Sequence, residues 1–216
     1  ESNYLRMRIR SKLLPDGTLR AHLQVQADGA PDTHIRRWLA RTPLRDRARS
    51  LRIGLAHGLP GAVVRNARWL DPEDFASPTQ LEADLEVPGY AVRAGDELLL
   101  VPLSHFLAFS PDWGMDFLNL DRPKKRRYPY RVRATRLVVV QEDLALPKGF
   151  RPIHTPARTE VSGEGAEYRY TADHAHGKLS VQVRFAIKHR ILSPDTYPNV
   201  REALAELKKR TRAFVV

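Results

Sequence analysis

The sequence predicts a mainly β protein of two β-sandwich-like modules, with short helices and a C-terminal α-helix. Apolar and polar residues alternate in several stretches of the 216-residue chain, which is the pattern of strands with one buried face. Gly, Pro and Asp residues stand between these stretches, where they favour turns. Two early stretches and one at the end of the chain instead repeat apolar residues at helical spacing.

The first expected element is a β-hairpin. Apolar residues alternate with polar ones through residues 5–9, the turn Pro15-Asp16-Gly17 follows, and residues 19–25 alternate again. The polar positions of the first strand are arginines, which the alternation places on its solvent side: Arg6, Arg8 and Arg10.

Two amphipathic helices and three strands are expected next. Either Asp32 or Thr33 can cap the first helix, and the second helix spans residues 44–55 and ends before Gly58. The last of the three strands is apolar almost throughout, which is typical of a strand covered on both faces. The three strands are expected at residues 63–70, 80–87 and 97–103.

The longest irregular stretch, residues 104–130, divides the chain. Connections of this length are usually functional or linking, so we place a module boundary near Tyr128. Residues 1–127 then form a β module with two short helices and a basic loop, and residues 128–216 form a β module with the C-terminal helix. The second module is expected to contain strands at residues 130–140, 144–147, 166–172 and 178–191, and a helix opened by Ser193-Pro194.

Composition excludes several classes of protein. The chain has no Cys, so it contains no disulfide, no thiolate zinc site and no cysteine nucleophile. Its longest apolar runs are far shorter than the ~20 residues of a membrane-spanning helix. The net charge of +11 favours a nucleic-acid or anionic-surface partner, although the charge is spread over outer faces.

The histidines and carboxylates offer weak candidates for chemistry. His174 and His176 alternate and could ligate a metal, but they also fit the tip of a hairpin, and no further ligand lies near them in the sequence. Asp71, Glu73 and Asp74 lie in a Pro-containing turn, where short acidic side chains serve the backbone. The sequence therefore indicates no catalytic residue and no cofactor.

The densest charge cluster is a candidate anion or partner patch. Five basic residues and a tyrosine could hold phosphates and stack on bases. The alternative is a solvated basic loop that leads into a strand. The cluster comprises Arg122, Lys124, Lys125, Arg126, Arg127 and Tyr128.

Several motifs carry a resemblance to a known family. The segment from Lys188 to Arg201, in which a strand enters a helix through Tyr197-Pro198, resembles the end of bacterial transglutaminase-like proteins of unknown function. Other landmarks of that family follow in the same order and cover nearly the whole chain: Leu14-Pro15-Asp16-Gly17, residues 35–39, Ala94-Gly95-Asp96 before the strand at 97–102, Arg127-Tyr128-Pro129 and Leu146-Pro147-Lys148-Gly149.

The resemblance implies a β-rich region C-terminal to a papain-like transglutaminase core. The family's Cys-His-Asp triad would then lie upstream of Glu1, and this chain would be a non-catalytic accessory or interaction domain. The implied partners are that core in the same polypeptide, another envelope protein or an anionic polymer. The implied setting is periplasmic or envelope-associated, with a cytoplasmic one left open. The alternative functions are a basic module that binds nucleic acid or an anionic envelope polymer, and an independent enzyme.

Overall fold

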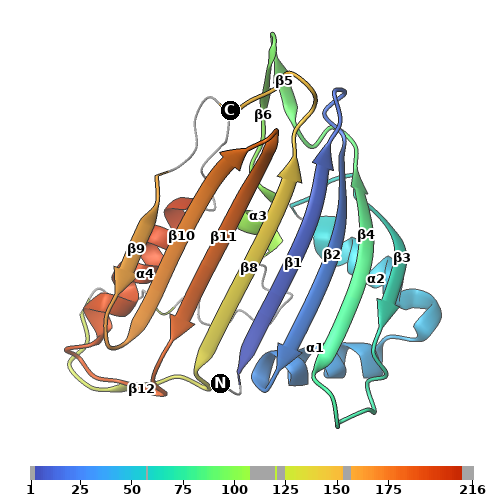
Figure 1. Ribbon diagram of the computed structural model, residues 1–216. Helices are drawn as coiled ribbons and strands as arrows, with labels where there is room; N and C mark the ends of the chain where they lie inside the picture. The colour runs from blue at the N-terminus through green and yellow to red at the C-terminus, as the bar shows by residue number, and fades with distance from the viewer. Residues whose placement is uncertain (1–2, 57, 108–119, 121–124, 153–156, 211–216) are drawn as a thin grey trace.

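The strands that the alternating pattern predicts join one large sheet. The computed structural model describes residues 3–56, 58–107, 120, 125–152 and 157–210. In it, eight strands form a mixed sheet in the order β3-β4-β2-β1-β8-β11-β10-β9 (Figure 1). Their bounds are β1 Tyr4–Leu13, β2 Leu19–Asp28, β3 Val63–Trp69, β4 Thr79–Val87, β8 Arg136–Ala145, β9 Thr159–Ser162, β10 Ala166–Ala175 and β11 Lys178–Ile187.

Two hairpins flank strand β8 in the middle of this sheet. β1 and β2 pair antiparallel from Tyr4 opposite Asp28 to Leu13 opposite Leu19. β10 and β11 form the second antiparallel hairpin. β8 pairs in parallel with β1 and antiparallel with β11. The sheet is therefore hydrogen-bonded across the expected module boundary, because β1 precedes residue 127 and β8 follows it.

The mainly β class and the C-terminal helix are confirmed. The arrangement differs from two sandwich-like modules, because the strands of both segments share one sheet and pack against helices. The apolar run of β8 explains the join. Val138 and Val140 pair with Leu5 and Met7 of β1, and all four side chains are buried under the same helical layer. Periodicity alone does not show which strands become neighbours.

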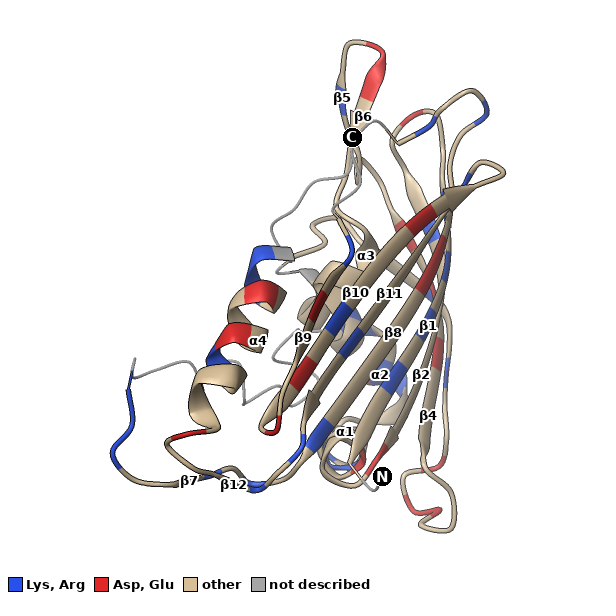
Figure 2. Cartoon of the chain, turned by 60° about the vertical axis from the view of Figure 1, so that its left-hand side comes forward, with Lys and Arg blue, Asp and Glu red and all other residues tan. Residues whose placement is uncertain are grey.

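The helices of the described residues all lie on one face of the sheet (Figures 1 and 2). α1 contacts β1, β2 and β4, α2 contacts β3, α3 contacts β8 and β11, and α4 contacts β9 and β10. None of these helices is long and apolar enough to cross a membrane. Their bounds are α1 Ala30–Arg41, α2 Leu44–Ala56, α3 Leu103–Leu107 and α4 Tyr197–Arg210.

Alternation along the strands separates a covered face from an open face. In β1 every second residue from Leu5 to Leu13 is buried, whereas the residues between them are exposed. The covered face holds the core, whose largest fully buried side chains include Tyr168, Tyr170 and Phe185. The apolar stripe predicted for the C-terminal helix is also buried there, on α4: Tyr197, Val200, Leu204 and Leu207.

The prediction of a strand at residues 97–103 is wrong in its length. Only Glu97–Leu99 is a strand, β6, and it forms a separate hairpin with β5, Val92–Ala94. Pro102, which lacks an N–H, ends the extended segment, and α3 starts at Leu103 with the N–H of His105 donating to the Pro102 carbonyl at 3.0 Å. The apolar run is buried because it packs against the large sheet, not because it lies inside it.

Three further boundaries differ from the sequence pattern. The expected strand 130–140 is divided into β7, Tyr130–Arg131, and β8, which continues through the segment expected at 144–147 up to Ala145. The expected strand 178–191 ends at Ile187, and β12, Ile191–Leu192, pairs with β7 in a separate ribbon. α1 begins after Gly29, which has a φ of +67°, and neither Asp32 nor Thr33 caps it.

The turn between β1 and β2 requires a glycine for two reasons. Gly17 has a φ of +81°, which L-amino acids rarely adopt. A Cβ atom at this position would also lie 2.5 Å from the carbonyl oxygen of Ala91. The Gly17 carbonyl accepts the N–H of Ala91 at 3.0 Å, so this turn ties the hairpin to the segment that follows β4.

Candidate docking surface on the open face of the sheet

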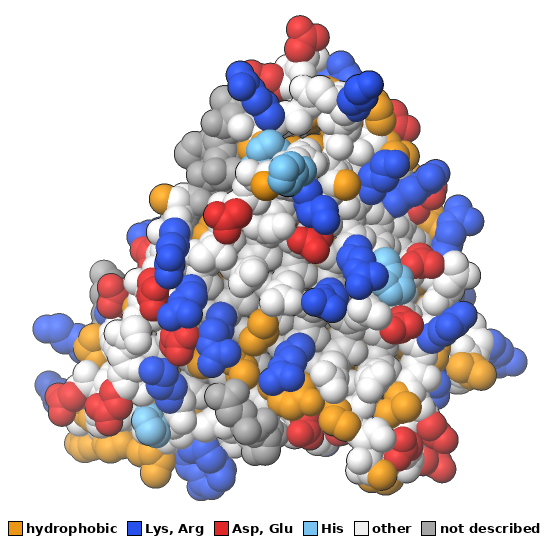
Figure 3. Space-filling model, in the orientation of Figure 1, with side chains coloured by type: hydrophobic (Ala, Val, Ile, Leu, Met, Phe, Trp, Pro, Cys, Tyr) orange, Lys and Arg blue, Asp and Glu red, His pale blue; other side chains and the backbone are white. Residues whose placement is uncertain are grey.

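The open face is the surface of the sheet that no described helix covers, and Figure 3 looks directly onto it. Basic side chains stand there among polar, uncharged ones. The cross-strand register shows how they are arranged. Arg8 of β1 has Gln24 of β2 on one side and Gln141 of β8 on the other, and Gln182 of β11 follows Gln141.

The acids of β4 are engaged by the strands beside them. Glu86 pairs with Arg20 of β2 at 3.2 Å. Asp84 accepts a hydrogen bond from Asn66 and is 2.8 Å from Nδ1 of His22, and these two contacts lower its pKa. Glu82 accepts a hydrogen bond from Nε2 of Gln24 at 2.9 Å. The acidic side of the open face is thus satisfied within the sheet.

The arginines of the opposite half are also paired. Arg184 of β11 lies 3.0 Å from Glu167, and Arg169 of β10 lies 2.7 Å from Glu160. The hydrogen bond and charge of Arg169 lower the pKa of Glu160. Arg20, Arg169 and Arg184, from three strands of this face, are therefore all ion-paired.

The central strand β1 departs from this arrangement. Four cations project from it at alternate positions, and within the described chain no ion pair reaches any of them. Asp143, the cross-strand neighbour of Arg10, accepts the hydroxyl of Ser180 at 2.8 Å instead. The guanidinium of Arg6 stacks 4.6 Å above the ring centre of Tyr4. We name these four side chains the basic column: Arg6, Arg8, Arg10 and Lys12.

Like charges in the basic column repel one another. Alternate residues of a strand are about 6.8 Å apart. Coulomb's law then gives about 0.6 kcal/mol of repulsion for each neighbouring pair in water before salt screening. The column therefore contributes nothing favourable to folding by charge, and an acidic partner would relieve the repulsion.

A shallow hollow of about 500 Å³ lies beside the first two cations of the column, Arg6 and Arg8. Its floor is formed by β1, β2, β4 and β8. Guanidinium and carboxamide groups dominate the polar part of its wall, which also includes one carboxylate, that of Glu82. The wall includes Arg6, Arg8, Gln24, Gln26, Gln80, Glu82, Val139 and Gln141.

The basic patch expected at residues 122–128 is only partly described. Arg122 and Lys124 lie outside the described residues. Arg126 lies 4.0 Å from the ring centre of Tyr130 and 4.7 Å from that of Tyr197, so it anchors the segment before β7 to α4. Lys125, Arg127 and Tyr128 are exposed. One of the expected ligand-binding cations therefore has a structural role.

The two candidate metal ligands lie at a hairpin tip. His174 is exposed at the end of β10, opposite Leu179 of β11, and His176 occupies the turn with a φ of +51°. The described part of the chain contains no group of three or more His, Cys, Asp or Glu side chains that could hold a metal ion. The hairpin interpretation of this motif agrees with the structure.

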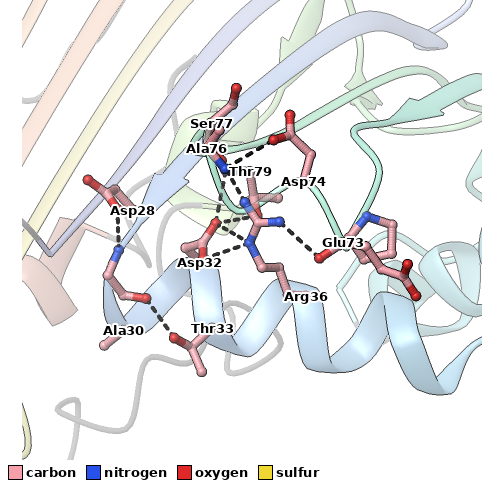
Figure 4. A network of polar contacts seen from close by, with 12 residues as sticks. Asp28, Ala30, Asp32, Thr33, Arg36, Glu73, Asp74, Ala76, Ser77 and Thr79 are labelled. Atoms are coloured by element: carbon pink, nitrogen blue, oxygen red, sulfur yellow. Dashed lines mark hydrogen bonds and ion pairs between the residues drawn. The ribbon is translucent and has the colours of Figure 1, made fainter.

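The acidic turn at residues 71–74 serves the backbone, as predicted. Asp71 accepts the N–H of Glu73 at 2.9 Å, and Asp74 accepts the N–H of Ala76 at 3.0 Å. Figure 4 shows that the loop is also held from α1 by Arg36, which donates to the carbonyls of Pro72 at 2.9 Å and Ser77 at 2.6 Å.

Asp32 and Arg36 together form a clamp between α1 and the start of β4. Asp32 accepts a hydrogen bond from Nε of Arg36 at 2.9 Å and another from the N–H of Thr79 at 2.9 Å. Burial alone would raise the pKa of Asp32, but the hydrogen bonds from Arg36 and Thr79 outweigh it and lower the pKa. The pair joins α1 to the start of β4, which is a structural role.

Glu142 is the most buried acid of the covered face. Its carboxylate accepts the hydroxyl of Ser11 at 2.7 Å and the backbone N–H of Ser104, at the start of α3, at 2.7 Å. Burial raises its pKa despite these hydrogen bonds. The carboxylate links β1, β8 and α3 and does not reach the open face.

Comparison with known proteins finds a family match for the C-terminal half of the chain. Residues 106–216 match the family described as "Domain of Unknown Function with solved-structure structure (DUF3858)". The chain belongs to this family. The DUF3858 match contains β8, β9, β10, β11 and α4, whereas the basic column lies on β1 outside it. No curated protein and no solved structure matches the chain.

Three of the four cations of the basic column were predicted to face outward, but they were not predicted to form a site. Arg6, Arg8 and Arg10 alternate with buried residues, which predicts their outward direction. The sequence does not show that the acids of β4 form their contacts with residues of β2 and β3, because those contacts depend on strand order. The signal that could have revealed the site is a run of cations on one face of a strand without acids between them.

Proposed function

We propose that this chain is a non-catalytic accessory domain that binds a partner on the open face of its sheet. The supporting observation is that four aligned cations in the middle of this face have no ion pair among the described residues, whereas Arg20, Arg169 and Arg184 of the same face are each paired with a glutamate. Hydrogen bonds and ion pairs on the covered face join its own elements, as Asp32 does with Arg36 and Glu142 does with Ser11. A partner with an acidic surface would complement the column.

We take the partner to be a transglutaminase-like core in the same polypeptide. The motifs that resemble that family, among them residues 188–201, support this choice. Because the chain has no cysteine, the nucleophilic thiol of such a core would belong to another part of the polypeptide. A periplasmic or envelope-associated location belongs to the same proposal.

Capture of the upstream segment of the same open reading frame tests this function. The immobilised chain should retain that segment at low salt and release it as salt rises, because the contact is made by exposed charges. The triple variant Arg6→Gln, Arg8→Gln, Arg10→Gln should bind about tenfold more weakly or worse. Equal capture by the wild type and this variant, or no capture at all, would contradict the proposal.

A second candidate function is the binding of an anionic polymer, either a nucleic acid or an envelope polymer. The basic column favours it, as do the exposed side chains of Lys125, Arg127 and Tyr128. Binding to such a polymer falls steeply with salt and depends little on the order of charges. A single-stranded oligonucleotide and a polyuronate that bind the wild type as tightly as the upstream segment does would favour this function.

A further inference from the structure

We propose that the basic column binds an extended acidic segment of polypeptide that carries carboxylates at alternate positions. The inference rests on the proposed function and gives the chemistry of the partner. The segment would lie along β1, above the hollow between β4 and β8, with its acidic side chains directed at Arg6, Arg8, Arg10 and Lys12.

The spacing of the column carries the argument. The four cations occupy every second position of one strand, so they recur about every 6.8 Å. An extended peptide has the same repeat on each of its faces. Carboxylates at positions i, i+2, i+4 and i+6 of such a peptide therefore meet successive cations in register, whereas consecutive acids place only half of their charges on the facing side.

The carboxamides beside the column suit a peptide backbone. Gln26 and Gln80 are cross-strand neighbours on one side of Arg6, and Gln24 and Gln141 lie on either side of Arg8. A carboxamide both donates and accepts hydrogen bonds, as the N–H and C=O groups of an extended peptide require. The Nε2 of Gln24 already donates to Glu82, which leaves its oxygen as an acceptor.

The hollow is less suited to a nucleic acid. Single strands are bound by aromatic side chains that stack on the bases. Among the described residues that line the hollow, none is aromatic.

Two peptides of one composition test the proposal. Both have nine residues, four Glu and five Thr. One carries Glu at positions 2, 4, 6 and 8, and the other carries the four Glu consecutively. We expect the alternating peptide to bind the full chain about fivefold to tenfold more tightly, because two more carboxylates face the column.

Two triple variants with the same change in charge locate the effect. Arg6→Gln, Arg8→Gln, Arg10→Gln removes most of the column and should abolish the preference. Arg20→Gln, Arg169→Gln, Arg184→Gln removes three arginines of the open face that are paired with Glu86, Glu160 and Glu167, and should keep it. Circular dichroism of each variant checks that the fold is intact.

The outcomes separate the inference from the proposed function. Equal affinity for the two peptides, or a preference that survives loss of the column, overturns the register argument. If neither peptide binds while the upstream segment is still captured through the column, the alternating-acid inference is wrong and the accessory function stands. If neither the peptides nor the upstream segment bind, both are wrong.

Discussion

The two faces of the sheet use charged residues in different ways. On the covered side, Arg36 and Glu142 each hold together elements of the chain itself, through hydrogen bonds between 2.6 and 2.9 Å long. On the open side, arginines of β2, β10 and β11, such as Arg184, also have acidic partners. The basic column alone combines a central position with the lack of an ion pair in the described chain. Four aligned cations with no ion pair among the described residues give a physical reason to regard the column as a binding surface.

The largest expected difference in the free energy of unfolding is between substitutions at two neighbouring residues of β1. Ile9 faces the core and is 1% exposed, while Arg8 faces solvent. Ile9→Ala should lower the free energy of unfolding by about 2–5 kcal/mol, because it leaves a cavity beneath the helices. Arg8→Gln should change it by less than about 0.5 kcal/mol. Urea unfolding followed by circular dichroism measures both, and a similar loss for the two variants would show that Arg8 has a structural role.

The clamp between α1 and β4 predicts the next largest effect. Arg36→Gln leaves the carboxylate of Asp32 partly buried without its cation, so it should destabilise the fold by about 3 kcal/mol. Adding Asp32→Asn should recover part of this loss, because the uncompensated charge disappears. A double-mutant cycle from urea unfolding gives the coupling. Strict additivity of the two substitutions would contradict the clamp.

Glu142 predicts a pH dependence with a defined sign. Since burial raises its pKa, the folded state retains a proton that the unfolded chain releases above the ordinary glutamate pKa of about 4.3. The contribution of Glu142 to stability is therefore complete below that pH and is lost as pH rises through the raised pKa. Glu142→Gln does not titrate, and its amide can still accept from the N–H of Ser104 and donate to Ser11.

The measurement for Glu142 is a difference between two proteins. Urea unfolding of the wild type and of Glu142→Gln should be compared from pH 4 to pH 8. The stability of the variant relative to the wild type should increase with pH across this window. A difference that stays constant would mean that the pKa of Glu142 is the same in the folded and unfolded chain.

The smallest expected change in stability is found by comparing substitutions of two arginines of the open face, one with an ion pair and one without an ion pair in the described chain. Arg184→Gln removes a partly exposed ion pair and should cost about 0.5 kcal/mol at low salt. Arg8→Gln relieves repulsion and should be neutral or slightly stabilising. Added salt should reduce both effects toward zero, as thermal unfolding at two salt concentrations would show. A loss of stability in Arg8→Gln that salt removes would reveal an attractive partner for Arg8 within the fold.

Local pattern predicted much of the fold. The hairpin of β1 and β2, the helices α1, α2 and α4, and strand β4 occur where alternation or helical spacing predicts them. The errors have physical causes. Apolar composition alone predicts one continuous strand over residues 97–103, but Pro102 ends the extended segment. The parallel pairing of β1 with β8 joins residues more than 130 positions apart. Neither the neighbours of a strand nor the burial of both its faces follows from its period.

The candidate site was predictable only in part. The outward direction of Arg6, Arg8 and Arg10 follows from the alternation with buried residues. Their lack of acidic partners does not, because it depends on strand order. The strand β2 separates the column from the acids of β4, and the hydroxyl of Ser180 of β11 donates a hydrogen bond to Asp143. The run at residues 122–127 is denser in charge, but Arg126 in it lies 4.0 and 4.7 Å from the centres of two tyrosine rings, those of Tyr130 and Tyr197.

The central claim is that a partner binds on the open face along β1. Backbone amide chemical shifts of the isotope-labelled chain, recorded while the unlabelled upstream segment is added, test it most directly. The account predicts the largest changes in residues 4–13 of β1 and in the facing parts of β2 and β8, with the helices little affected. Changes confined to the helices of the covered face or to residues 125–128 would contradict it.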